Sequence, residues 1–247
     1  MKIKRDFYLT QLIDRKHNRM IKIVSGIRRC GKSYLLSELF TQHLLDEGVD
    51  RHHIIHIDLD TRDNLEYRNP DACNQYVKSL IKDDNMYYLL LDEVQLMEDF
   101  VSVLNGFLHI KNLDVYVTGS NSKFLSSDIV TEFRGRGDEI RVYPLSFAEI
   151  YPIYDNNWEK AWGDYTVYGG IPLVFTYKKE EDKVKYLKNL FKETYLKDII
   201  ERNRIKSTEE LEELLNILAS NIGSLVNPQK LTATFKSVKK VDLSAPT

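Results

Sequence analysis

The sequence predicts a three-layer α/β domain with a five-stranded parallel sheet, followed by a helical appendage. Five short apolar stretches, rich in β-branched and aromatic residues, alternate with segments of helical periodicity. This order is typical of parallel strands joined by right-handed helical crossovers. The third stretch is apolar on both faces, as expected of a strand in the middle of a covered sheet. The predicted strands are 20–25, 53–58, 86–92, 113–118 and 139–143.

The segments between these strands have the spacing of amphipathic helices. One apolar stripe follows Ser33 and ends at Gly48, a residue type common just beyond a helix C-terminus. A second helix is expected from Asn69-Pro70, because Asn caps a first turn and Pro fits the first helical position. Strands and helices together predict a first domain over 1–150. The stripes are Leu36, Leu39, Phe40 and Leu44; Tyr76 and Leu80; and Met97, Val101, Leu104 and Leu108.

After Pro144 the pattern changes to helices, and no strand is expected. The apolar spacing between Val184 and Ile199 predicts one long helix. Another is predicted to begin at Ser207, where Ser-Thr-Glu-Glu has the form of a capping box. The predicted domains after the first are a helical lid or linker over 151–206 and a last helical segment over 207–247.

Composition and charge narrow the class of protein. The chain has 247 residues, 43% hydrophobic and 29% charged, which excludes collagen-like, low-complexity and wholly disordered classes. Its net charge of -2 gives no global attraction to nucleic acid or membrane, although local patches stay open. Its 2 cysteines are too few for a disulfide scaffold, and no apolar run reaches the length of a membrane span. Because the start also lacks an apolar signal segment, we expect a cytoplasmic protein.

The segment Gly26-Ile-Arg-Arg-Cys-Gly-Lys-Ser33 fits the pattern G-x-x-x-x-G-K-[ST] between a predicted strand and a predicted helix. Its two glycines allow the backbone to curl and to aim N–H groups at phosphate oxygens. The positive end of the following helix adds to this attraction, and Lys32 places a charge on the β- and γ-phosphates. The Ser33 hydroxyl is a hard oxygen ligand suited to Mg²⁺. The sequence therefore predicts a P-loop NTPase domain.

This phosphate loop, residues 26–33, is expected to bind ATP through a continuous run of residues. Arg28 and Arg29 are either phosphate contacts or solvated loop charges, and the sequence leaves both interpretations open. Cys30 is interpreted as a small filler rather than a nucleophile, since no histidine partner is evident nearby. The predicted nucleotide-binding residues are Gly26, Ile27, Arg28, Arg29, Cys30, Gly31, Lys32, Ser33 and Tyr34.

A pair of acidic residues, Asp92 and Glu93, ends the third predicted strand. The carboxyl ends of parallel strands face the crevice in which open α/β sheets bind ligands. We expect Asp92 to hold Mg²⁺, directly or through water, and Glu93 to be the general base for the water that attacks the γ-phosphate. The alternative is a solvated pair at a strand end. The phosphate loop upstream favours the catalytic interpretation, because both features then belong to one site.

Polar and basic residues follow the fourth predicted strand. Ser120 or Asn121 is expected to orient the attacking water or to sense the γ-phosphate, with a plain turn as the alternative. Arg136 is a candidate for stabilising the phosphate charge of the transition state, within the chain or toward a neighbouring subunit. Arg134 is at least as well explained as a solvated loop residue.

Several segments, in this order, resemble one known group of proteins, the bacterial and archaeal AAA-type ATPases that carry a C-terminal domain of unknown function. The last two segments make the resemblance specific, and it covers nearly the whole chain. The segments are Gly-Ile-Arg-Arg-Cys-Gly-Lys-Ser, Leu-Leu-Leu-Asp-Glu-Val-Gln, Val-Thr-Gly-Ser-Asn-Ser, Gly-Arg, Tyr143-Pro-Leu-Ser-Phe-Ala-Glu149 and Tyr168-Gly-Gly-Ile-Pro172.

The resemblance implies an ATPase core that uses ATP and Mg²⁺, with Ser120 as polar sensor and Arg136 as candidate arginine finger. Members of the group usually continue through a winged helix into a further domain. We therefore expect the chain to stop within the winged-helix segment, in 207–247. Such proteins often assemble into rings, and oligomerisation is left open. The phosphate, metal and base roles given above fall on Lys32, Ser33, Asp92 and Glu93.

Three functions compete on the sequence. The first is an ATPase switch in which the γ-phosphate state moves the C-terminal helices. The second is a nucleotide-dependent module with little turnover that binds DNA or a protein partner through those helices. The third, a small-molecule kinase, is disfavoured because Glu93 directly after Asp92 suits activation of water. The chain lacks an Asn-Lys-x-Asp guanine motif, which favours ATP through the resemblance.

Overall fold

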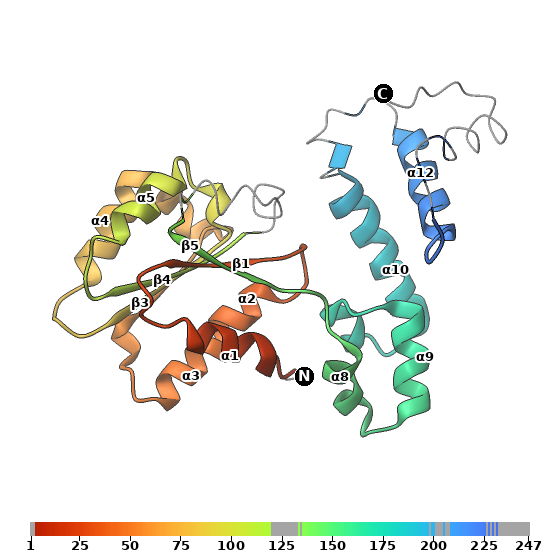
Figure 1. The fold of residues 1–247 in the computed structure, drawn as a ribbon, viewed down its shortest axis with the longest axis horizontal. Helices are drawn as coiled ribbons and strands as arrows, with labels where there is room; N and C mark the ends of the chain where they lie inside the picture. The colour runs from red at the N-terminus through yellow and green to blue at the C-terminus, as the bar shows by residue number, and fades with distance from the viewer. Residues whose placement is uncertain are drawn as a thin grey trace. The chain divides into compact units, whose positions relative to one another are not determined.

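The computed structural model describes residues 3–119, 133, 135–197, 199–200, 205, 208–225, 227, 229 and 231. Contacts within the chain divide it into two compact units, Met1–Val184 and Lys185–Thr247, and each is described by itself. The first unit holds the sheet and the helices that cover it (Figure 1). None of the described helices has both the length and the apolar composition needed to cross a membrane.

The sheet has five parallel strands in the order β2-β3-β4-β1-β5, which confirms the predicted architecture. The fifth strand begins two residues earlier than expected. Its ladder with β1 pairs Ile21 with Gly137 and Ser25 with Arg141, so β5 ends where β1 ends. The strands are β1 (Ile21–Ser25), β2 (Ile54–Asp58), β3 (Tyr87–Asp92), β4 (Leu113–Thr118) and β5 (Gly137–Arg141).

Helices cover both faces of the sheet, with α4 and α5 on one side and α1, α2 and α3 on the other (Figure 1). The helix after the phosphate loop is continuous and contains a π-helical stretch, η1, between α2 and α3. The expected cap of α4 is present, because the Asn69 side chain accepts a hydrogen bond from the Ala72 backbone N–H at 3.1 Å. The helices are α1 (Asp6–Asp14), α2 (Lys32–Tyr34), η1 (Leu35–Phe40), α3 (Thr41–Asp46), α4 (Pro70–Leu80) and α5 (Phe100–Phe107). Short 3-10 turns are η2 (Arg51–His53), η3 (Arg62–Arg68) and η4 (Val94–Leu96).

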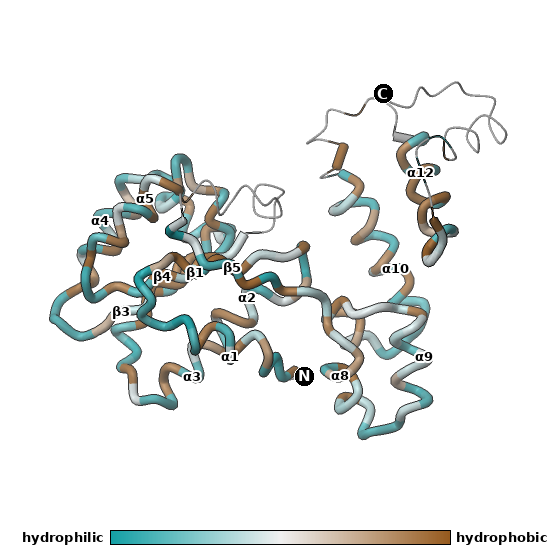
Figure 2. Tube along the Cα trace, in the orientation of Figure 1, coloured by the Kyte–Doolittle hydropathy of each residue, from teal (hydrophilic) through white to brown (hydrophobic). Residues whose placement is uncertain are grey.

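The central strands contribute to two separate hydrophobic cores. Because successive strand residues point to opposite faces, one core takes one set of side chains and the second core takes their neighbours. Each buried apolar side chain contributes about 1.5–3 kcal/mol relative to an exposed one, so the double burial fixes these strands in the middle. Figure 2 shows that the covering helices, by contrast, alternate between hydrophilic and hydrophobic residues. Ile23, Leu89 and Val117 face the α4–α5 core, and Val24, Leu90 and Tyr116 face the other.

After β5 the first unit continues as a helical segment. The first helix of this segment begins with a capping box, in which the side chains of Ser146 and Glu149 each accept a hydrogen bond from the other's backbone N–H. Leu145 and Ile150 pack there with Ile3 from the start of the chain. The elements are α8 (Phe147–Ile150), η5 (Tyr151–Tyr154), α9 (Trp158–Tyr168) and η6 (Pro172–Thr176).

The second unit is helical in its described part. Helix α10 (Glu180–Leu190) runs across the boundary between the units and continues as the π-helical η7 (Phe191–Leu196), and α12 (Thr208–Ser220) follows. The predicted capping residue Ser207 and about half of the predicted winged-helix segment, including residues 232–247, lie outside the described residues. The domain limits 151–206 and 207–247 stay predictions.

Candidate functional site

The strand order brings the two sequence motifs to one place. The phosphate loop follows β1, and Asp92 ends β3. Strand β4 lies between β1 and β3, so its last residue, Thr118, lies between the two motifs. In a parallel sheet these strand ends share one edge, which is where α/β folds bind ligands.

The phosphate loop depends on its first glycine. Gly26 has a φ of 149°, and a Cβ atom built there would lie 2.3 Å from the Val142 carbonyl oxygen. Any other residue type at position 26 would displace either the loop or Val142, which follows β5. Gly31 has a φ of 99° and precedes the first helical residue, Lys32. The loop therefore curls back over its own helix N-terminus, as anion binding requires.

Lys32 is folded into this loop. Its ammonium group is buried and donates hydrogen bonds to the carbonyl oxygens of Gly26 and Ile27, each at 3.1 Å. Among the described residues its hydrogen bonds go to neutral carbonyl groups, and a charge away from water is best stabilised by an opposite charge. The arrangement favours an anionic partner for Lys32.

Asp92 is buried beside two hydroxyl side chains. It is 6% exposed, and the Thr118 hydroxyl donates a hydrogen bond to its carboxylate. Burial raises the pKa of Asp92, whereas the Ser33 and Thr118 hydroxyl groups act in the opposite direction because they favour the carboxylate. Glu93 and Asp58 nearby add to the rise in pKa by charge repulsion. A cation bound here would offset both the cost of burying the Asp92 charge and its repulsion by Glu93 and Asp58.

Glu93 adopts a strained backbone conformation directly after the strand. Its φ of 53° and ψ of 47° lie in the left-handed region, which costs a non-glycine residue energy and is common at active sites. Its backbone N–H donates a hydrogen bond to the Thr118 hydroxyl at 3.0 Å, which holds this turn against β4. Its carboxylate accepts a hydrogen bond from the Gln95 side chain.

A cavity of about 580 Å³ joins these residues, within the size range of a small-molecule site. One group of its lining residues is polar and surrounds the strand ends. A second group is largely apolar and comes mainly from the start of the chain and from the segment after β5, with Tyr34 from α2 and Leu96 from η4. The polar group is Arg28, Arg29, Gly31, Lys32, Ser33, Asp58, Asp60, Asp92, Glu93 and Gln95; the second is Ile3, Arg5, Tyr34, Leu96, Leu145, Pro172, Leu173 and Thr176.

Most predicted nucleotide-binding residues line this cavity, but three do not. Gly26 and Ile27 contribute carbonyl groups to Lys32 instead. Cys30 is fully buried behind the loop, and its thiol lies 3.5 Å from the Val142 carbonyl oxygen. Burial raises the pKa of the Cys30 thiol, which disfavours its thiolate form.

The structure shows where Arg136 lies. Its carbonyl oxygen accepts a hydrogen bond from Ile21, the first residue of β1, and its guanidinium lies 3.3 Å from the Asn105 side-chain oxygen. It therefore lies at the amino edge of the sheet, one five-residue strand or about 16 Å from the edge that carries the phosphate loop. Its role toward phosphate, within the chain or toward a neighbouring subunit, stays a prediction. Ser120, Asn121 and Arg134 lie outside the described residues.

Several cavity residues were not singled out from the sequence. Arg5 lies outside the segments that carry the resemblance. Gln95 lies inside one of them without a predicted role, as does Thr118, which contacts Asp92 beside the cavity. Leu145 and Pro172 lie inside the two segments that make the resemblance specific. The structure explains those segments, because the Leu145 N–H donates to the Gly170 carbonyl at 2.7 Å and so joins them.

Comparison with known proteins agrees with this geometry. A family model described as an AAA domain matches residues 18–151, and one described as a domain of unknown function, DUF8612, matches residues 159–247. An uncharacterized protein of Haemophilus influenzae is 32% identical over 241 residues, and uncharacterized protein MJ1544 of Methanocaldococcus jannaschii is 27% identical over 231 residues. These matches cover 95% and 87% of the chain, which spans 60% and 50% of the length of these two curated relatives.

The fold is similar to that of a solved structure, the Walker-type ATPase of Pyrococcus abyssi. The TM-score is 0.60 at 15% identity, covering 98% of this chain and 86% of that one. At this identity the similarity concerns the fold alone. The AAA domain model spans more than half of the chain and contains the phosphate loop, Asp92 and Glu93. The chain therefore belongs to the AAA domain family of P-loop ATPases, with a domain of unknown function in its C-terminal region.

Proposed function

We propose that this protein binds and hydrolyses ATP with Mg²⁺ and that its nucleotide state controls the C-terminal helices. The observation that carries the proposal is that Ser33, Asp92 and the buried Lys32 line one cavity. A hydroxyl, a carboxylate and an ammonium group around one cavity are the combination that phosphoryl transfer uses.

Ser33 and Asp92 fit Mg²⁺ by the chemistry of their donor atoms. Both offer hard oxygen ligands, and Mg²⁺ in phosphate sites is commonly held by one or two such side chains together with phosphate oxygens and water. The ion would supply positive charge that neutralises the phosphates and relieves the repulsion felt by Asp92. These two residues are the ones we propose to hold it.

The remaining roles follow from position. Lys32 would exchange its two carbonyl partners for phosphate oxygens, a gain because the new partners are charged. Glu93 follows Asp92 directly, so its carboxylate would orient and deprotonate the attacking water. The apolar walls at Leu145, Pro172 and Leu173 suit the flat face of a nucleobase.

A second candidate function is a nucleotide-dependent binding module with little turnover. The observation that favours it is the hydrogen bond from Gln95 to the Glu93 carboxylate, which occupies an oxygen that a general base needs. In this case ATP would stabilise a surface for a DNA or protein partner on the C-terminal helices. That partner, oligomerisation and the cytoplasmic location stay predictions.

Phosphate release separates the two functions. We expect the wild type to release phosphate from MgATP and Glu93→Gln to be slower by about 100-fold or more, the usual contribution of a general base. ATP binding, measured by calorimetry, should survive in Glu93→Gln. The matched control is Glu98→Gln, an exposed carboxylate outside the cavity, which should keep the wild-type rate.

Each other outcome has a clear meaning. Equal rates for the wild type and Glu93→Gln would remove Glu93 from catalysis. Tight ATP binding with no phosphate release by the wild type would favour the binding module. A wild-type protein that neither binds ATP by calorimetry nor releases phosphate from MgATP would refute both candidate functions.

A further inference from the structure

Arg5 lies at the start of the chain, immediately before α1, and is only 2% exposed. Its guanidinium group contacts three separate segments. One nitrogen donates to the Cys30 carbonyl oxygen in the phosphate loop at 3.1 Å, and another to the Tyr143 carbonyl oxygen after β5 at 2.7 Å. The third, Nε, forms an ion pair with a carboxylate oxygen of Glu149 at 2.8 Å, without the geometry of a hydrogen bond. The ring of Tyr8 covers the guanidinium at 4.6 Å.

The two oxygens of Glu149 have different partners. Oε1 pairs with Arg5, whereas Oε2 accepts hydrogen bonds from the Ser146 N–H at 2.8 Å and the Ser146 hydroxyl at 2.9 Å. The second set forms the cap that starts α8. Glu149 therefore connects Arg5 directly to the first turn of the helical segment, although Glu149 itself does not line the cavity.

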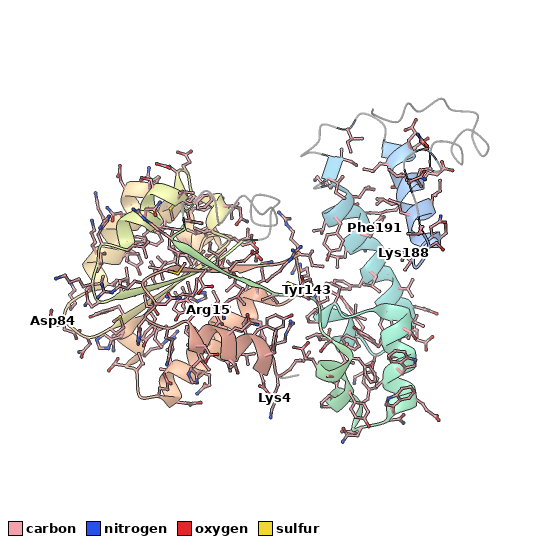
Figure 3. All side chains as sticks on the ribbon, in the orientation of Figure 1. Lys4, Arg15, Asp84, Tyr143, Lys188 and Phe191 are labelled. Atoms are coloured by element: carbon pink, nitrogen blue, oxygen red, sulfur yellow. The ribbon has the colours of Figure 1, made fainter. Side chains whose placement is uncertain are left out.

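The helical segment that begins there returns to the cavity. Its residues Pro172, Leu173 and Thr176 form part of the cavity wall. Figure 3 labels Tyr143, which lies between the sheet and this segment. Arg5 thus holds the phosphate loop, the exit from the sheet and the helical segment together at one buried point, and it also lines the cavity.

We propose that Arg5 is a positioning residue that couples the phosphate loop to the helical segment 146–176 through Glu149. This rests on the proposed function, because the loop must bind a nucleotide for its state to change. When Lys32 exchanges loop carbonyls for phosphate, the loop backbone rearranges, and the Cys30 carbonyl held by Arg5 lies in that loop. The guanidinium of Arg5 is rigid and planar. A movement of the Cys30 carbonyl that moves this group also disturbs its ion pair with Glu149, because a buried charge is costly without its partner.

The chain contains its own reporter of this coupling. It has 2 tryptophans, Trp158 and Trp162, both on α9. Their rings contact Phe147 of α8, at 6.1 Å and 5.2 Å between ring centroids. Because Phe147 follows the cap that Glu149 forms, the fluorescence of these tryptophans reports the helical segment and not the sheet.

The test measures binding of Mg²⁺ with AMPPNP, a non-hydrolysed ATP analogue, by calorimetry and by tryptophan fluorescence. We expect the wild type to bind and to change its fluorescence. In Glu149→Gln the fluorescence change should be lost and the affinity should fall about 5-fold or more, the size of a typical coupling. The double variant Arg5→Gln with Glu149→Gln should bind no more weakly than Arg5→Gln alone, because both residues act through one connection.

Three controls separate coupling from loss of structure. Ser146→Ala removes the cap of α8 but keeps the pair of Arg5 and Glu149, so its fluorescence change should persist. Arg15→Gln removes an ion pair to Asp138 remote from the cavity, at 2.9 Å, and should bind as the wild type does. Arg5→Lys, which keeps charge but loses the fork, gives a second test in a protein that keeps a cation at this position.

Thermal melting without and with AMPPNP completes the test. A purely structural role would lower the melting temperature of Glu149→Gln but leave its increase on adding AMPPNP unchanged, and that result would overturn the proposal. A wild-type fluorescence change in Glu149→Gln, or additive losses in the double variant, would also overturn it. Failure of the wild type to bind AMPPNP would instead refute the proposed function.

Discussion

The Thr118 hydroxyl donates a hydrogen bond to the Asp92 carboxylate, and the same oxygen accepts one from the Glu93 backbone N–H at 3.0 Å. One hydroxyl from β4 therefore fixes both the proposed metal ligand and the backbone of the proposed general base. The hydrogen bond from Thr118 also counters the effect of burial on the pKa of Asp92.

Replacing Thr118 by Val keeps the shape of the side chain and removes the hydroxyl. The Asp92 carboxylate and the Glu93 N–H would both lose a partner in a buried place, so we expect the free energy of unfolding to fall by about 1–3 kcal/mol. Urea unfolding measures this loss. Thr118→Ser, which keeps the hydroxyl, should lose less; equal losses for Val and Ser would show that the hydrogen bonds contribute little.

Asp92→Asn should stabilise the protein in the absence of nucleotide. Burial raises the pKa of Asp92, so the folded protein binds a proton at this carboxyl more tightly than the unfolded chain does. At pH values above the raised pKa, the charged carboxylate therefore destabilises the fold. Removing the charge should raise the melting temperature at neutral pH by about 2–4 °C, which corresponds to about 1 kcal/mol in a chain of this size.

This gain has a defined pH dependence. It should shrink as the pH falls, because protonation of Asp92 in the wild type then relieves the same cost. Asp60→Asn, at an exposed position on the cavity wall, should show no such gain. A melting temperature of Asp92→Asn that stays at or below that of the wild type at neutral pH would contradict this account.

Two glycines of the helical segment should respond to alanine in opposite ways. A Cβ atom on Gly170 would lie 2.1 Å from the Leu145 carbonyl oxygen, so Gly170→Ala should cost about 1–3 kcal/mol as the two segments move apart. Gly163 lies within α9 with nothing within 4 Å of an added Cβ, so Gly163→Ala should stabilise the protein by up to about 1 kcal/mol. Denaturant midpoints compare the two directly, and a stable Gly170→Ala would disprove the close contact.

A buried ion pair within the sheet gives the last prediction. Lys22 on β1 and Asp114 on β4 are 0% and 4% exposed at their side chains, and burial lowers the pKa of Lys22. Asp114→Asn would leave the Lys22 charge without its partner, at a cost of about 3–5 kcal/mol in urea unfolding. Glu47→Gln, which breaks a partly exposed pair with Lys16, should cost less than about 1 kcal/mol. Similar losses in the two variants would mean that Lys22 finds another partner.

Local sequence was sufficient for much of the fold and for the centre of the site. Strand positions followed from runs such as 86–92, because burial on both faces leaves a continuous apolar pattern. The phosphate loop and the pair Asp92 and Glu93 could be found because each is a short contiguous motif. The fifth strand was shifted by two residues, since register depends on its neighbour β1 and not on its own composition.

Short motifs along the chain were therefore enough to propose the chemistry of the candidate site: a loop for phosphate, a hydroxyl, and two carboxylates on a parallel sheet. The other residues that join them are set by long-range packing. Thr118 reaches the site because β4 lies between β1 and β3, and Arg5 because α1 packs beside the loop, whereas Arg136 lies at the opposite edge of the sheet because it precedes β5. Strand order and long-range contacts come from the packing of the whole chain, and no local pattern of residues encodes them.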